Sequence, residues 1–215
     1  MNPCDISLYA ILDPHRTQGR PLTDMAKAAA DGGITLLQYR DKEAGTRTMV
    51  KNAERIKRAL DPYSIPLLVN DRVDVALAVE ADGVHVGQSD MKPVDTRRLL
   101  GPNAIIGLTI KTVEHAQQAP LDLIDYACIG GVYSTLSKVN PGNIGLEGWA
   151  SISSVFRQKC PTMPVGAIAG IDASNLQAVL ENGADGAAII SAIFMADDVE
   201  AATRELKNIV GVNLS

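Results

Sequence analysis

Residues 65–90 read IPLLVNDRVDVALAVEADGVHVGQSD, and this stretch decides the fold. It contains two short apolar runs, Ile65–Val69 and Gly83–Val86, with a helix-like segment between them. Neighbouring parallel strands lie about 4.8 Å apart, and their carboxyl ends meet at one rim of the sheet. Polar residues follow each run at once, including Asp71 after the first and Asp90 after the second. The stretch therefore predicts a strand–helix–strand unit that brings two carboxylates to the same rim.

A joint between a helix and a strand recurs along the chain. Ala-Asp-Gly occurs at residues 30–32, 81–83 and 184–186, in the first case with a further glycine, and an apolar run follows each time. Glycine here can take the left-handed conformation that ends a helix. A chain that alternates strands and helices in this way requires a parallel sheet covered by helices.

Eight apolar runs are strand candidates, near residues 7–12, 34–38, 65–69, 83–86, 104–108, 124–129, 164–168 and 186–190. The helix candidates between them are Leu22–Ala30, Thr46–Leu60, Val73–Glu80, Val94–Leu100, Val113–Ala119, Leu146–Gln158, Ala173–Glu181 and Val199–Ile209, with Thr23, Thr112 and Asp172 as N-caps. Eight such units predict an α/β fold, a single (β/α)8 TIM barrel over residues 1–215. An open doubly wound sheet is the alternative, although no glycine-rich dinucleotide turn follows the first strand.

The composition is that of an ordinary soluble globular protein, with 46% hydrophobic and 21% charged residues. The net charge of -5 argues against a nucleic-acid partner. No apolar run approaches the roughly 18 residues of a membrane span, and the first residues do not resemble a signal peptide. The three cysteines have no metal-binding spacing, so we interpret them as reduced thiols and expect a cytoplasmic protein.

The carboxyl ends of the strands are where a barrel of this kind carries its active site. Early strands end in cations and carboxylates, which are suited to Mg²⁺ and a pyrophosphate. Late strands end in glycine, serine and backbone amides, which are suited to a second phosphate. The rim residues are Arg40, Lys42, Asn70, Asp71, Gln88, Asp90, Thr109, Tyr133, Ser134, Thr135, Ser137, Lys138, Ala169, Gly170 and Ser191.

Several of these residues also have a purely structural interpretation. Asp71 alone could be the N-cap of the helix that follows it, and only its combination with Lys42 and Asp90 favours a functional role. Cys128 lies in an apolar run and is interpreted as a core residue rather than a nucleophile. His85, on an apolar strand, is interpreted as a hydrogen-bonded core histidine rather than a catalytic base.

Four stretches resemble the thiamine-phosphate synthase family: QYRDK at 38–42, NDRVDVA at 70–76, DGVHVGQSD at 82–90 and ISAI at 190–193. The resemblance extends from Tyr9 to Phe194. It implies a (β/α)8 barrel that joins a hydroxymethylpyrimidine pyrophosphate to a hydroxyethylthiazole phosphate. The products are thiamine phosphate and pyrophosphate, and Mg²⁺ is required.

The resemblance also implies roles for individual residues. The pyrimidine pyrophosphate is expected at Gln38, Arg40, Lys42, Asn70 and Thr109, and Mg²⁺ at Asp71 and Asp90. Thr135, Ser137 and Lys138 match a substrate-binding loop, and the thiazole phosphate is expected at Gly170, Ile190 and Ser191. Arg40, Lys42 and Lys138 are the expected catalytic cations, because they would stabilise the departing pyrophosphate. The loop departs from the family pattern at Gly131, Ser134, Ser137 and residues 139–141.

Two other functions remain alternatives at this point. One is a related barrel that only tautomerises the thiazole, which by resemblance would lack much of the pyrophosphate and metal set. The other is a non-catalytic barrel that binds phosphorylated ligands. In every case the expected partners are small phosphorylated molecules rather than nucleic acid or a membrane, and assembly into a homo-oligomer stays open.

Overall fold

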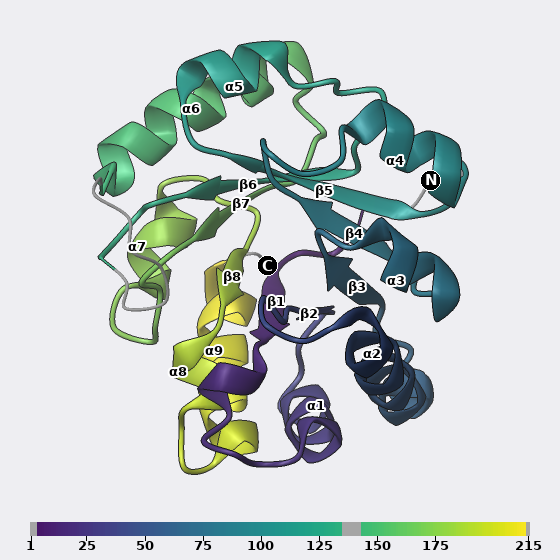
Figure 1. Cartoon of the computed structure of the whole chain (residues 1–215). Helices are drawn as coiled ribbons and strands as arrows, with labels where there is room; N and C mark the ends of the chain where they lie inside the picture. Colours follow the sequence, from purple (N-terminus) through teal and green to yellow (C-terminus); the bar gives the residue numbers. More distant parts are fainter. Residues whose placement is uncertain (1–3, 135–142, 214–215) are drawn as a thin grey trace.

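The computed structural model describes residues 4–134 and 143–213. Within them, parallel strands close into one eight-stranded barrel, each paired with its neighbour in sequence and β1 paired with β8 (Figure 1). The strands are β1 (Leu8–Leu12), β2 (Leu36–Tyr39), β3 (Leu67–Asn70), β4 (Gly83–Val86), β5 (Ile105–Ile110), β6 (Tyr126–Gly130), β7 (Val165–Ile168) and β8 (Ala187–Ile189). The predicted (β/α)8 barrel is confirmed. The open sheet is wrong, because Tyr9 of β1 pairs with Ala188 of β8.

Helices surround the barrel on its outside (Figure 1). They are α1 (Leu22–Asp31), α2 (Thr46–Leu60), α3 (Val73–Ala78), α4 (Pro93–Leu100), α5 (Val113–Gln118), α6 (Gly145–Lys159), α7 (Leu176–Glu181), α8 (Ser191–Phe194) and α9 (Val199–Asn213), with short 3-10 turns η1 (Pro14–Arg16) and η2 (Asp61–Tyr63). The short helix α8 has no counterpart among the sequence predictions. None of the helices in the described part of the chain has the length and apolar character needed to cross a membrane.

One of the three predicted N-caps is confirmed. The Thr112 hydroxyl accepts a hydrogen bond from the backbone N–H of His115 at 3.2 Å and caps α5. Thr23 is not a cap, because α1 already begins at Leu22, after Pro21. Asp172 does not directly precede α7, which begins at Leu176, but its carboxylate accepts from the backbone N–H of Ser174 and its carbonyl from that of Leu176, so it caps the turn that leads into this helix.

The strands separate two apolar layers. Alternate side chains face the helices and form the larger cluster, while the others fill the barrel interior. The interior cluster consists of Ile6, Tyr9, Ile11, Leu36, Leu68, Tyr126, Cys128 and Ala188. Burial raises the pKa of the Cys128 thiol to about 12, so it is a core residue that lacks the thiolate character of a nucleophile.

Side-chain oxygens tie neighbouring strands together at the amino-terminal end of the barrel. Asp82, just before β4, accepts a hydrogen bond from the backbone N–H of Leu67 at 2.8 Å. Asp125, directly before β6, accepts from Ile106 at 2.8 Å, and Asp185, two residues before β8, accepts from Val165 at 2.7 Å. Thr35 does the same before β2, where it accepts from Leu8 at 3.1 Å. The aspartates of two of the three Ala-Asp-Gly repeats therefore help to hold the barrel closed.

The repeated helix ends differ in detail from the prediction. Three helices end in a Schellman motif, with a left-handed residue directly after the C-cap: Gly33 after α1, Glu80 after α3 and Gly183 after α7. The left-handed assignment is therefore wrong for Gly83 and Gly186. These two need glycine because a Cβ would lie within 2.0 Å of a carbonyl oxygen of the adjacent strand or of the segment leading into it.

Glu80 is the one non-glycine residue in these three equivalent positions, with φ of 50°. A residue with a Cβ at such a φ is destabilised by about 1–2 kcal/mol. Glycine removes this strain, but part of the benefit is offset because glycine loses more conformational freedom on folding. Glu80→Gly should therefore raise the free energy of unfolding by about 0.5–1 kcal/mol in urea denaturation. Glu80→Ala removes the same charge but keeps the Cβ, so it should give no such gain. Equal effects of the two substitutions would contradict this explanation.

Candidate active site

The polar rim predicted from sequence exists because all strands of the closed barrel are parallel. Their carboxyl ends lie at one end of the barrel, and the residues that follow them share one rim. Asn70 and Asp71 belong to the end of β3, and Gly87 and Asp90 follow β4. The neighbouring strands β3 and β4 pair up to Asn70 and His85, which brings the two aspartates together.

Asp71 and Asp90 form a pair of contacting carboxyl groups. Asp71 has a left-handed backbone with φ of 60°, and its N–H donates to the carbonyl of His85 at 2.9 Å. Its side chain contacts Asp90 and also accepts a hydrogen bond from the Lys42 ammonium. The N-cap of α3 is Arg72, which makes no side-chain capping bond, so the capping interpretation of Asp71 is wrong.

Asp90 is held by the turn that it ends. Its carboxylate accepts from the backbone N–H of Gly87 at 2.8 Å, and a Cβ on Gly87 would lie 2.9 Å from the same oxygen. Burial raises the pKa of Asp90, and the hydrogen bond with Asp71 raises it further. The charged form of Asp90 beside a second carboxyl group is an electrostatic cost that a bound cation would relieve.

The donor set of this pair fits Mg²⁺. The described residues contain no cluster of three or more histidine, cysteine, aspartate or glutamate side chains arranged for a metal. Two carboxylates are enough for Mg²⁺, which keeps several water ligands and takes the others from substrate phosphates. A structural zinc site would instead need four protein ligands. The pair therefore suits a metal that is shared with a phosphorylated ligand.

One cation contacts the carboxylate pair, and a second cation follows the same strand, β2, two residues earlier. Lys42 is half-exposed and contacts Asp71, whereas the Arg40 guanidinium is largely buried and contacts Asp13. Asp13 follows β1 and is only 5% exposed; its second oxygen accepts from the backbone N–H of His15 at 3.0 Å. Sequence reasoning missed Asp13. Its signal was the position directly after a strand, the same feature that identified Asp71.

Three polar residues lie deeper than the cations. Gln38 is buried, and its amide donates to the Tyr9 hydroxyl. Thr109 contacts His85 through its hydroxyl at 2.8 Å. Asn70 is 8% exposed, and its amide nitrogen, although buried, has no hydrogen-bond partner among the described residues. A buried unpaired donor costs about 1–3 kcal/mol, so Asn70 is a group that a ligand acceptor would satisfy.

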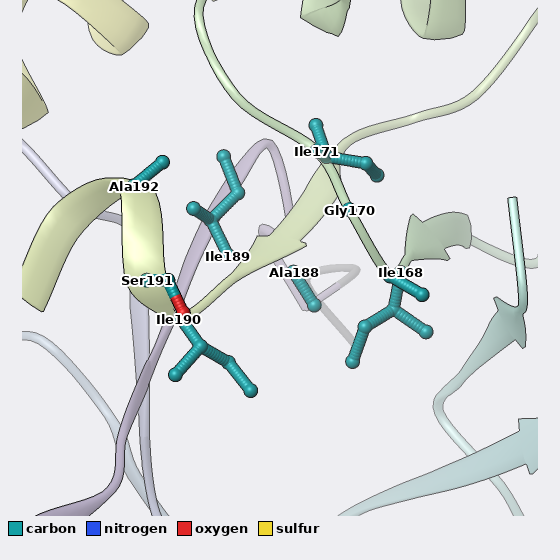
Figure 2. Close-up of a pocket in the computed structure, with 9 residues that line it drawn as sticks. Ile168, Gly170, Ile171, Ala188, Ile189, Ile190, Ser191 and Ala192 are labelled. Carbon is teal, nitrogen blue, oxygen red and sulfur yellow. The ribbon is translucent and has the colours of Figure 1, made fainter. Parts of the chain in front are cut away.

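The ends of β7 and β8 form a separate, mostly apolar pocket that Figure 2 shows. Its walls include Ile168, Ile190 and Gly170, and Ser191 starts α8 at its edge. Gly170 has φ of 65°, and a Cβ there would lie 2.4 Å from the carbonyl oxygen of Ser134. Gly170 is thus required both by its backbone conformation and by the close approach of the segment after β6.

The structure brings most of the predicted site residues to one end of the barrel. Gln38, Arg40, Lys42, Asn70, Asp71, Asp90 and Thr109 lie on the early and central strands, and Gly170, Ile190 and Ser191 line the pocket at β7 and β8. Thr135, Ser137 and Lys138 lie outside the described residues. His85 is hydrogen-bonded through both ring nitrogens, which confirms its interpretation as a buried, hydrogen-bonded histidine.

Comparisons with known proteins agree on one family. The family model described as thiamine monophosphate synthase matches residues 8–193. The chain is 48% identical to the thiamine-phosphate synthase of Agrobacterium fabrum, over 100% of this chain and 98% of that one. It is 41% identical to the thiamine-phosphate synthase of Azorhizobium caulinodans, over 97% of each chain. The solved structure of thiamine phosphate pyrophosphorylase from Pyrococcus furiosus superposes with a TM-score of 0.86 at 37% identity, covering 99% of this chain and 98% of that one.

The carboxylate pair makes a prediction about stability that does not require catalysis. Asp90→Asn removes a carboxyl group whose charged form is disfavoured by burial and by Asp71. The melting temperature measured without metal should therefore not fall in this variant. Mg²⁺ with pyrophosphate should raise the melting temperature of the unmodified protein but not that of the variant. Asp74→Asn, which changes an exposed carboxylate paired with Arg72 on the adjacent helix, is the control and should keep the Mg²⁺ effect. Loss of stability without metal, together with an intact Mg²⁺ effect in Asp90→Asn, would assign Asp90 a structural role.

Proposed function

The chain belongs to the thiamine monophosphate synthase family, whose members are transferases of thiamine biosynthesis, and from this premise we propose how its rim works. The proposed reaction joins an aminopyrimidine carrying a methylene pyrophosphate to a thiazole that carries a phosphate. The products are thiamine phosphate and inorganic pyrophosphate. The observation that carries this assignment is the contact of Asp71, Asp90 and Lys42 at one end of the barrel.

The early half of the rim is the proposed pyrophosphate site. Lys42 and Arg40 provide two positive charges, and Asp71 with Asp90 would hold Mg²⁺. When bound, the metal would neutralise charge on the pyrophosphate oxygens and so make pyrophosphate a better leaving group. Asp13 supports the same site indirectly, because it holds the Arg40 guanidinium in place against the end of β1.

The proposed mechanism is dissociative. The carbon–oxygen bond to pyrophosphate breaks first, both electrons leave with the pyrophosphate, and the thiazole nitrogen then attacks the methylene cation. Such a reaction needs cations where negative charge develops and two substrates held close together. It needs no protein nucleophile. In support of this, His85 is committed to hydrogen bonds inside the barrel, and Cys128 is buried with a raised pKa.

The pocket at β7 and β8 is the proposed site of the thiazole phosphate. Its apolar walls, Ile168 and Ile190, suit the uncharged part of a thiazole, and Gly170 allows the backbone to approach a ligand closely. Ser191 lies at the edge of this pocket and would face the phosphate (Figure 2). The two halves of the rim would then hold the two substrates on opposite sides of the reacting carbon.

Pyrophosphate release tests this function directly. The purified protein should release pyrophosphate and form thiamine phosphate when both substrates and Mg²⁺ are present. Isomerisation of the thiazole without pyrophosphate release would instead indicate a tautomerase. Tight binding of either substrate without turnover would indicate a binding protein, and both outcomes would contradict the proposal.

Lys42 is the more exposed of the two cations in the proposed pyrophosphate site. A hydrogen bond to a charged group contributes about 1.5–3 kcal/mol, so Lys42→Ala should weaken pyrophosphate binding by roughly ten- to a hundredfold. Titration calorimetry with pyrophosphate and Mg²⁺ measures this loss. Lys27→Ala removes an exposed lysine from the outer helix α1 and should leave the affinity unchanged. Equal affinities of the Lys42 and Lys27 variants would remove Lys42 from the site.

Substitutions at Ser191 can test whether the two halves of the rim bind different substrates, and they do not require a change in the backbone. Gly170 is less suitable, because a side chain there would collide with the Ser134 carbonyl. Ser191→Asp places a negative charge beside the proposed phosphate, and this repulsion should raise the KM for the thiazole phosphate roughly tenfold or more. The KM for the pyrimidine pyrophosphate should change much less, and Ser191→Ala should have a small effect on both. A similar rise in both constants for Ser191→Asp would contradict separate sites for the two substrates.

A further inference from the structure

The segment between β1 and α1 lies between the two halves of the rim, because β1 pairs with β2 on one side and with β8 on the other. At the start of this segment, Asp13 holds Arg40 of the proposed pyrophosphate site. At its end, Arg20 contacts the short helix α8, which follows β8 (Figure 1). The segment therefore contacts both halves of the rim, one through a carboxylate and the other through a guanidinium.

Four consecutive backbone carbonyls at the end of α8 accept side-chain hydrogen bonds from this segment. The Arg20 guanidinium donates to the carbonyls of residues 194, 196 and 197 at 2.6, 2.9 and 3.4 Å. The Gln18 amide donates to the remaining one, that of Met195, at 3.1 Å. Carbonyls at the end of a helix have no partner within the helix, so other groups must satisfy them. No glycine follows α8 directly, and these two side chains satisfy the carbonyls instead.

A tight turn holds Arg20 in this position. Gln18 and Gly19 both have a left-handed backbone, with φ of 55° and 77°, and the N–H of Arg20 donates to the carbonyl of Thr17 at 3.0 Å. Positive φ at both central residues is the mark of a type I′ turn. The Arg20 Nε–H donates to the same Thr17 carbonyl, also at 3.0 Å. The guanidinium is therefore fixed by its own segment as well as by α8.

The residues that Arg20 holds are one helical turn away from the pocket at β7 and β8. The N–H of Phe194 donates to the carbonyl of Ile190 at 2.9 Å, and the N–H of Met195 donates to that of Ser191 at 3.0 Å. Ile190 and Ser191 line the pocket. A helix of four residues is too short to be stable by itself. The position of α8 thus depends on its buried apolar side chains and on the contact with Arg20.

We infer that Arg20 is a positioning residue for the thiazole phosphate: it fixes α8, and through α8 the wall of the pocket that residues 190–192 form. In the described part of the chain the pocket is lined by residues 168–171 and 188–192, which do not include Arg20. Arg20 therefore acts through the backbone. A pocket loses affinity when one wall must first be ordered, because only the ordered fraction is competent to bind. This inference rests on the proposed function for the identity of the ligand.

Hydrogen exchange tests the role of Arg20 in the free protein. Arg20→Ala should speed the exchange of the Phe194 and Met195 backbone N–H groups roughly tenfold or more, because α8 opens more readily without these hydrogen bonds. Arg97→Ala is the matched control, since the Arg97 guanidinium also donates to several backbone carbonyls, but at the amino-terminal end of the barrel. It should leave exchange in α8 unchanged. Unchanged exchange in Arg20→Ala, or an equal increase in both variants, would overturn the inference.

Equilibrium binding of the two substrates provides the second test. In Arg20→Ala the dissociation constant of the thiazole phosphate should rise roughly tenfold, in line with the lost hydrogen bonds. That of the pyrimidine pyrophosphate with Mg²⁺ should not change. The kcat at saturating thiazole phosphate should stay close to that of the unmodified protein, because bound ligand orders the wall again. Arg97→Ala should change neither dissociation constant. A lower kcat with unchanged thiazole affinity, or an equal loss of affinity for both substrates, would contradict the inference.

Two milder variants separate geometry from charge and from folding. Arg20→Lys keeps the positive charge but replaces the planar fork of donors by a single ammonium, so it should recover little of the lost affinity. Full recovery would assign the effect to charge alone and overturn the inference. Gln18→Ala removes one exposed amide from the same set of contacts. It should speed exchange in α8 and weaken thiazole phosphate binding by a smaller factor, which decides the matter if Arg20→Ala does not fold.

The outcomes also distinguish this inference from the proposed function. Failure of the unmodified protein to bind the thiazole phosphate would contradict the proposed function. The exchange measurements need no ligand, so they decide whether Arg20 holds α8 in either case.

Discussion

Closure of eight parallel strands into one barrel is the constraint on which the rest of this structure depends. Closure places every strand's carboxyl end at one rim, and so collects side chains that are far apart in the sequence. It also limits the space inside. Gly83, Gly107 and Gly186 lie where a Cβ would come within 2.1 Å of a neighbouring atom. Gly107 leaves room for the Tyr126 and His85 side chains inside the barrel, whereas Gly83 and Gly186 let neighbouring backbone segments approach closely.

The two ends of the barrel use aspartate in opposite ways. At the amino-terminal end, Asp82, Asp125 and Asp185 accept backbone hydrogen bonds, and the last two also pair with Arg97 and Arg157. These carboxylates are satisfied within the protein and stabilise closure. At the opposite end, Asp71 and Asp90 contact each other, and the Asn70 amide nitrogen has no partner in the described part of the chain. Adjacent carboxyl groups and an unpaired buried donor are features that a site for a charged, polar ligand requires.

Much of the fold could be predicted from the sequence because its signals are local. Apolar runs and helix-to-strand joints marked all eight strands, and each of them is observed within two residues of the predicted start and end. The polar residues after those strands were predicted in the same way, since a strand end is also a local feature. The errors are local too. Residues 34–35 and 124–125 look like strand, but Thr35 and Asp125 use their side chains to hold the preceding strand.

What the sequence by itself determined is therefore the order of elements, the closed barrel and the polar character of its rim. Only the tertiary structure decided that Asp13 holds Arg40, that Asp71 contacts Asp90 rather than capping α3, and that the Tyr9 and Tyr126 hydroxyls meet inside the barrel. Tyr9 and Tyr126 are 117 positions apart in the chain and belong to non-adjacent strands. No periodicity along a strand or helix reports such a contact, because it arises only when closure brings opposite walls of the barrel within hydrogen-bonding distance.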